Sequence, residues 1–220
     1  MATLDYQHGG DAFREKRADW RRRIFGVSRI EVWKALAGEI HARVEPRGWW
    51  RSDRVIADVG PWQLTLDTYT VSSGQSHQVF TRLRAPFVND GFRFRVYRKS
   101  IFSGLGKKLF GMQDIEIGEP FFDDDFIIQS NDEAGVRMLL RDARLRQLIA
   151  VQPRIMFEVK DDEGYFGPHF PQGVDELRFS AVGLIRDVNL LKQLFDLFAE
   201  TLHRLCDIGA ARDQRPGVQL

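Results

Sequence analysis

An acidic segment at residues 114–125 carries the side chains best suited to metal or acid–base chemistry. It lies within GMQDIEIGEPFFDDDFIIQSNDE (111–133), which has eight carboxylates and no Lys or Arg. Mg²⁺ and Ca²⁺ both prefer carboxylate oxygens, and two carboxylates can act as general acid and base. If this region is extended, alternation places Asp123 and Asp125 on one side, which makes them the candidate metal ligands. The spacing does not fit an EF-hand, because isoleucines stand at the fifth and sixth positions of that loop.

Two predicted strands are basic and so carry the opposite charge to the acidic segment. They are HQVFTRLRA (77–85) and FRFRVYRK (92–99). Alternation predicts that four arginines lie on one face if the strands pair as a hairpin: Arg82, Arg84, Arg93 and Arg95. Like charges directly across strands are destabilising, so this anion-binding face needs an anion nearby. The acidic segment is the favoured source, and nucleic acid, lipid head groups or simple solvation are the others.

Other motifs for catalysis or nucleotide binding lack the required spacing. SGLGKKLFG (103–111) has the composition of a phosphate loop, but Ile101 stands where Walker A has its first glycine, and Lys108 where it has Ser or Thr. The histidines are scattered without a zinc motif, and no G-x-S-x-G elbow occurs. We therefore expect a binding protein more than an enzyme, and no cofactor.

Composition indicates a globular chain. The 220 residues are 43% hydrophobic and 12% aromatic, and the single cysteine, Cys206, excludes a disulfide within the chain. The first residues do not form a secretory signal, and no stretch approaches the ~20 apolar residues of a membrane-spanning helix. These features predict a cytoplasmic protein.

The net charge of +1 combines two halves of opposite sign. Residues 1–112 contain 20 Lys/Arg and 11 Asp/Glu, which gives +9, whereas residues 113–220 contain 12 and 20, which gives −8, and the two sum to +1. Such asymmetry can mark a surface for nucleic acid or an anionic membrane. The near-neutral total instead favours halves that attract each other within one fold, because nucleic-acid domains tend towards a clear basic excess.

Hydrophobic periodicity predicts an α+β fold. Helical spacing occurs in three segments: 28–44 with Ser28 as N-cap, 131–150, and 188–207. Strand patterns occur in eight, of which the first four suggest a meander: 54–59, 62–71, 77–85, 92–99, 113–117, 126–129, 154–161 and 176–185. Because no run of βαβ units appears, we predict a largely antiparallel sheet on which an N-terminal helix, a middle helix and a long C-terminal amphipathic helix pack.

The chain is expected to divide into three parts: a mobile N-terminal arm at 1–25, a single α+β domain at 26–209 (β-rich over 50–118, βαββα over 119–209), and a disordered tail at 210–220. Ser130 and Glu133 have the spacing of a capping box at the start of the middle helix. The C-terminal helix has an apolar stripe that could support a homodimer: Leu191, Leu194, Phe195, Phe198, Leu202 and Leu205.

The phrase FFDDDFIIQSNDE resembles one in an uncharacterised bacterial family of domains of unknown function. The shared pattern is F-x-x-x-F-x-x-x-S-N-D-E, in which Phe122 and Phe126 lead into a strand and Ser130 precedes a helix. The resemblance covers Gly111 to Ile149. Some members of the family are linked to membranes through added apolar segments, which this chain lacks. The resemblance implies the α+β fold and brings no activity with it.

The sequence therefore predicts a non-catalytic binding or interaction module with a cationic strand face. Its partner would be a second copy of the chain or an unknown protein. Two alternatives remain open: an enzyme or a metal- or ligand-binding protein that uses residues 114–125, and nucleic-acid binding through the basic hairpin.

Overall fold

The chain folds into one sheet with helices packed against it. The computed structural model describes residues 28–46, 53–74, 76–101, 113–161 and 170–220; the predicted N-terminal arm and the glycine-rich segment 103–111 lie outside these ranges. The helices are α2 (Arg29–Glu39), α3 (Pro120–Asp125), α4 (Glu133–Leu139), α5 (Ala143–Ala150) and α6 (Val188–Asp207). A 3₁₀ turn covers Lys99–Ile101.

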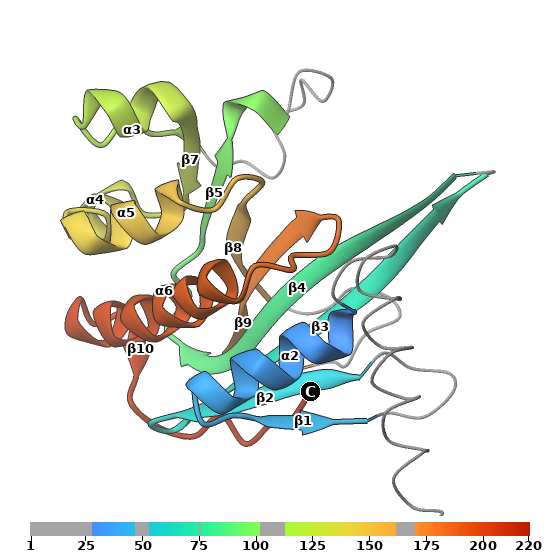
Figure 1. Cartoon of the computed structure of the whole chain (residues 1–220). Coiled ribbons are helices and arrows are strands. Elements are labelled where there is room, and N and C mark those ends of the chain that lie inside the picture. The colour runs from blue at the N-terminus through green and yellow to red at the C-terminus, as the bar shows by residue number, and fades with distance from the viewer. Residues whose placement is uncertain (1–27, 47–52, 75, 102–112, 162–169) are drawn as a thin grey trace, which may run out of the picture.

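The strands are β1 (Arg43–Glu45), β2 (Arg54–Val59), β3 (Trp62–Ser73), β4 (Ser76–Asn89), β5 (Phe94–Arg98), β6 (Gln113–Asp114), β7 (Phe126–Ser130), β8 (Met156–Lys160), β9 (Val174–Val182) and β10 (Ala211–Arg212). Their order in the sheet is β1-β2-β3-β4-β9-β8-β5-β7-β6, and β10 also pairs with β4. All pairs of named strands are antiparallel. Figure 1 shows α2 and α6 lying across the sheet, with α5 beside α6. The predicted α+β class is confirmed.

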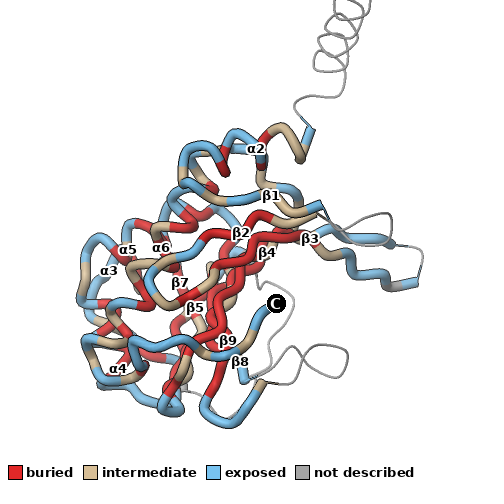
Figure 2. The backbone as a smooth tube through the Cα atoms, turned by 90° about the horizontal axis from the view of Figure 1, so that it is seen from below, coloured by how far each residue is buried: buried red, intermediate tan, exposed pale blue. Residues whose placement is uncertain are grey.

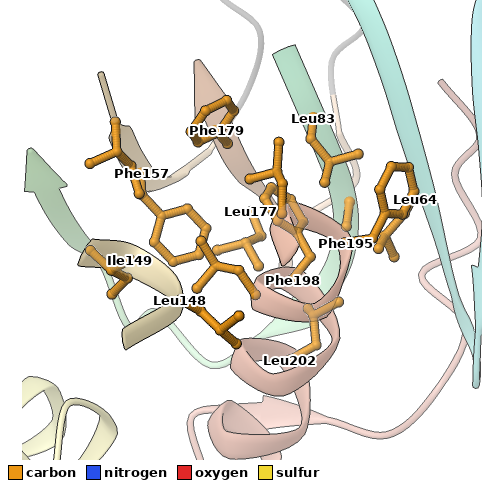
Figure 3. Packing of buried hydrophobic residues seen from close by; sticks show 14 of the residues in the cluster. Leu64, Leu83, Leu148, Ile149, Phe157, Leu177, Phe179, Phe195, Phe198 and Leu202 are labelled. Carbon is orange, nitrogen blue, oxygen red and sulfur yellow. The ribbon is translucent and has the colours of Figure 1, made fainter. Parts of the chain in front are cut away.

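The core lies between the sheet and these helices. Strand residues such as Leu83, Leu177 and Phe157 meet Phe195 and Phe198 of α6 (Figure 3), and all five are at most 5% exposed. The middle strands are buried along most of their length (Figure 2). Burial of a large apolar side chain contributes about 1.5–3 kcal/mol. The predicted apolar stripe of the C-terminal helix is thus used inside the chain: Leu191, Leu194, Phe195, Phe198, Leu202 and Leu205.

Helix α2 begins as predicted and ends earlier. Ser28 is its N-cap, and Glu31 completes a capping box with it. The predicted helix over 28–44 ends at Glu39 because His41 adopts a left-handed φ of 53°, after which β1 pairs with β2. The side chain that satisfies the first helical amides is therefore readable from the sequence, whereas the turn that ends the helix is not.

The predicted meander is correct for three strands and wrong for the fourth. β2, β3 and β4 are consecutive neighbours, but β5 does not pair with β4. The far edge of β4 pairs with β9, and β8 lies between β9 and β5. The basic hairpin therefore does not exist, and its two arms lie on strands separated by two others.

The predicted middle helix is two helices, and its predicted capping box is wrong. β7 continues through Ser130, whose hydroxyl donates to the carbonyl of Arg93 at 2.7 Å. The N-cap of α4 is instead Asp132, which accepts from the amide of Gly135 at 3.0 Å. The helix is interrupted after Leu139, and Asp142 is the N-cap of the second helix, α5.

The segment predicted as a disordered tail, 210–220, has regular contacts. β10 pairs with the end of β4, and Arg212 forms an ion pair of 2.7 Å with Asp90. Arg54 donates to the carbonyl of Leu220. This segment is ordered by backbone pairing with β4, and the side-chain composition of the segment does not reveal such pairing. None of the helices in the described ranges is long and apolar enough to cross a membrane.

Candidate functional site

One row of polar and charged side chains crosses the sheet from β3 to β6. Neighbouring strands place its members directly opposite one another: Thr65, Arg84, Arg178, Glu158, Arg95, Gln129 and Asp114. Adjacent residues such as Leu83 and Leu177 point to the helices, so by alternation the row lies on the opposite face. We call the following residues of that side the charged face: Asp67, Arg82, Arg84, Arg95, Glu158, Glu176 and Arg178.

Asp67 joins two of the predicted anion-binding arginines. Its Oδ1 and Oδ2 accept from Arg82 Nε and Nη2, each at 2.8 Å, and Oδ2 also accepts from Arg84 Nη2 at 2.7 Å. Asp67 is 6% and Arg84 4% exposed. Burial by itself would raise the pKa of Asp67, but the hydrogen bonds from Arg82 and the charge of Arg84 outweigh it and hold that pKa below its ordinary value. Asp67 is therefore an ionised carboxylate that fixes two guanidinium groups.

Glu176 is the second acid beside these arginines and is held differently. It is fully buried, Arg84 Nη1 lies 3.8 Å from its Oε2, and neither oxygen has a hydrogen-bond partner among the described residues. Burial raises the pKa of Glu176, although the charges of Arg84 and Arg178 oppose that rise. The guanidinium of Arg178 lies over the ring of Tyr69, with its Cζ 5.7 Å from the ring centroid.

The other two predicted anion-binding residues have partners of their own. Arg95 Nη2 lies 2.6 Å from Glu158 Oε2, and Arg93 Nη1 lies 3.0 Å from Asp161 Oδ2. The structure thus does not gather Arg82, Arg84, Arg93 and Arg95 into one open cationic face. Their anions come from strands of the same sheet and from the end of β8, so the prediction that residues 114–125 neutralise them is wrong.

The acidic segment is a strand only at Asp114 in β6, and its three consecutive aspartates lie in helix α3. Pro120 occupies the first turn of α3, where its missing amide costs nothing. Asp123 accepts from the backbone amides of Ile117, Gly118 and Glu119 at 3.0, 2.9 and 2.9 Å. The side chain predicted as a metal ligand therefore closes the turn that leads into α3.

Asp125, the other candidate metal ligand, pairs with Arg98 Nη1 at 3.0 Å. Lys99 contacts the same helix, since its Nζ donates to the carbonyl of Asp123 at 2.7 Å. Within the described ranges, no group of three or more His, Cys, Asp or Glu side chains is arranged to hold a metal ion. Arg98 and Lys99 thus reach the aspartates of the acidic segment, and Arg146 reaches Glu119 of the same segment.

Helices α3, α4 and α5 carry two neighbouring cavities. One, of about 310 Å³, is the phenylalanine cavity, lined among others by Phe121, Phe122, Phe126, Ala143 and Ala150. The other, of about 340 Å³, is the arginine cavity: Ile117, Glu119, Arg137, Met138, Leu140, Arg141 and Arg146. Both cavities also share Glu119 and Arg146, whose ion pair of 2.9 Å forms a common wall.

The entrance of the phenylalanine cavity carries an unusual side chain. Phe121 is 94% exposed, whereas its neighbour Phe122 is 6% exposed and stacks on Phe126 with 4.5 Å between ring centroids. Met138, which lines the arginine cavity, is also half exposed. Large apolar side chains exposed beside a cavity mark interaction sites more often than singly scattered ones.

Sequence reasoning missed both the partner of the β4 arginines and these cavities. Asp67 was readable, because the short turn after Ser73 pairs Ser73 with Ser76, and counting back along both strands sets Asp67 opposite Arg82. The cavities were not readable, because they depend on the break between α4 and α5 and on how α3 docks beside them.

Searches against protein families, curated proteins and solved structures found no match to the chain.

Proposed function

We propose that this protein is a non-catalytic interaction module that binds a segment of a partner protein on the surface of α3, α4 and α5. The observation that carries the proposal is Phe121, a fully presented aromatic ring beside the phenylalanine cavity. Aromatic anchors that fill adjoining cavities dominate the energy of protein interfaces. The partner segment is expected to place a large apolar side chain between Phe121 and the cavity floor formed by Phe122 and Phe126.

The proposed binding surface lies on the helices α3, α4 and α5 and not on the arginine-bearing strands. Arg82, Arg84 and Arg95 contact carboxylates of the same chain, so an external anion would have to displace them. Nucleic-acid binding through Arg82, Arg84, Arg93 and Arg95 loses support for this reason. A metal site on Asp123 and Asp125 loses support because both already have protein partners.

The other expected partner is a second copy of the chain, bound through α6 in a homodimer. Since the apolar stripe of α6 is buried in the same chain, such a dimer would have to use the polar side of the helix, for example Lys192 and Glu200. We also propose that the chain belongs to the bacterial family whose helix-entry phrase it resembles, and the stacked Phe122 and Phe126 give that phrase a structural role.

The test is selection of a random peptide library on the purified full chain. Peptides that share a large apolar residue should be enriched, and Phe121→Ala should weaken them at least about tenfold, which corresponds to ~1.4 kcal/mol. Val151→Ala is the matched control, because Val151 is also exposed and apolar but lines neither cavity. Thermal melting checks the fold of both variants.

Peptides that bind wild type and Phe121→Ala equally, or a library from which nothing is enriched, would contradict the proposal. Retardation of DNA or RNA that weakens steeply with salt would favour the nucleic-acid alternative instead. A sedimentation mass of two chains at high concentration would point to the homodimer.

A further inference from the structure

In the arginine cavity, the guanidinium of Arg141 has no carboxylate partner among the residues that the structure describes. Arg137 forms an ion pair of 2.9 Å with Glu133, and Arg146 one of 2.9 Å with Glu119. Arg141 is exposed, and no carboxylate among the described residues lies within ion-pair distance of it. The residues that line this cavity include three arginines and one glutamate, so an anion is the ligand that complements it.

Arg146 holds one wall of the arginine cavity in a fixed position. Its Nη1 donates to the carbonyls of Leu140 and Arg141 at 2.7 and 2.9 Å, while its Nη2 contacts Glu119. These carbonyls end α4 and would otherwise oppose an anion, because unsatisfied carbonyls carry negative partial charge. Arg146 is only 17% exposed in its side chain, so the wall that it forms is held in place from three directions.

The position of the cavity indicates the source of the anion. Glu119 and Arg146 line both cavities, so a group in the arginine cavity lies directly next to a group in the phenylalanine cavity. An extended peptide projects successive side chains a few ångströms apart along its length. One short segment can therefore occupy both cavities with an apolar and an acidic residue.

We propose that the arginine cavity binds a carboxylate, supplied by an Asp or Glu side chain of the partner segment whose apolar residue occupies the phenylalanine cavity. The inference rests on the proposed function and names the chemistry of the partner. Arg141 is the main contact, with Arg137 beside it, and the Glu119–Arg146 pair stays intact as the wall. Guanidinium groups bind carboxylates through charge-assisted hydrogen bonds, which are roughly twice as strong as neutral ones.

The test uses two small probes that differ in one charge. Acetyl-glutamate amide and acetyl-glutamine amide are titrated into the full chain, and binding is followed through the NMR signals of the arginine Nε–H groups. The glutamate probe should bind saturably and at least about tenfold more tightly than the glutamine probe. Arg141→Gln should abolish that difference. Arg144→Gln is the matched control and should retain it, because Arg144 is an exposed arginine of α5 that does not line the cavity.

Three results would overturn the carboxylate subsite. The two probes could bind equally, or Arg141→Gln and Arg144→Gln could weaken binding of the glutamate probe equally. The cavity could also bind inorganic phosphate but not the glutamate probe. The small probes carry no large apolar group, so their binding does not depend on Phe121. If they fail while library peptides still require Phe121, the interaction surface stands and only the subsite is wrong. If they bind while no peptide is enriched, the subsite stands and the proposed function is wrong.

Discussion

Arg84 Nη2 lies 2.7 Å from Asp67 Oδ2 in the interior of the sheet, and the same carboxylate accepts two hydrogen bonds from Arg82. Removing the charge of Asp67 takes away the carboxylate that accepts hydrogen bonds from two guanidinium groups in a buried position. We expect Asp67→Asn to lower the free energy of unfolding by about 3–5 kcal/mol, the usual cost of breaking a buried ion pair from one side. Denaturant unfolding measures it.

The control for Asp67 is an exposed pair. Glu133→Gln removes the carboxylate that pairs with Arg137, both side chains being about half exposed, and should cost less than about 1 kcal/mol. The pH dependence gives a second check. Because the folded pKa of Asp67 lies below its ordinary value of 3.8, its stabilisation is present above that pH and is lost as pH falls through the folded pKa. Asp67→Asn should remove this acid-side loss.

Glu176 should show the opposite pH dependence. Its folded pKa lies above the ordinary value of 4.5, so the folded chain binds more protons than the unfolded chain between these two pH values. Stability therefore falls as pH rises from 4.5 through the folded pKa. Glu176→Gln should flatten the free energy of unfolding over this window, whereas Glu116→Gln, at an exposed position, should not. An unchanged pH profile in Glu176→Gln would show that the carboxylate is solvated or hydrogen-bonded in solution.

Two adjacent aspartates of α3 should differ sharply in their contribution. Asp123→Ala removes the acceptor of three backbone amides and should cost about 2 kcal/mol, because hydrogen bonds to a charged group contribute about 1.5–3 kcal/mol. Asp124→Ala, at an exposed position, should stay within about 0.5 kcal/mol. Millimolar Mg²⁺ or Ca²⁺ should leave the melting temperature of wild type unchanged. A rise that Asp123→Ala abolishes would restore the metal site.

Two helical glycines should respond in opposite directions to alanine. A Cβ at Gly135 would lie 2.6 Å from Asp132 Oδ2 and 2.8 Å from Phe92 Cε2, so Gly135→Ala should destabilise by about 1–3 kcal/mol. Gly38 of α2 has nothing within 4 Å of that position, so Gly38→Ala should stabilise by about 0.5 kcal/mol through helix propensity. Equal effects at both sites would mean that the tight packing of α4 against Phe92 relaxes without cost.

The sequence predicts the elements well because their signals are local. Each signal depends on residues that are close in the sequence: the N-cap at Ser28, the apolar spacing of α6, and the alternation in β2 to β4. The predicted strand order failed at β5 because alternation says which face a residue occupies and nothing about which strand lies beside it. The charged face was anticipated as a set of arginines, and its acids were assigned to the wrong segment for the same reason.

The candidate site could be predicted only in part. Asp123 and Asp125 were chosen on the assumption of a strand, whereas Pro120 starts a helix there and changes the direction of each carboxylate. Phe121 and Phe122 are identical in type, and no local pattern distinguishes the exposed ring from the buried one. The buried ring of Phe122 stacks on Phe126 of β7 with 4.5 Å between ring centroids, whereas Phe121 is 94% exposed.

The strand order has a consequence for the synthesis of this protein. β4 and β5 follow each other in the chain, but β9 and β8 must come between them in the sheet. A nascent chain that has completed β7 therefore holds two half-sheets, each with an open edge, that cannot join until residues 156–182 have left the ribosome. Open strand edges invite pairing with other chains. During translation, this late hairpin is therefore the step that joins the two half-sheets and pairs the edges of β4 and β5.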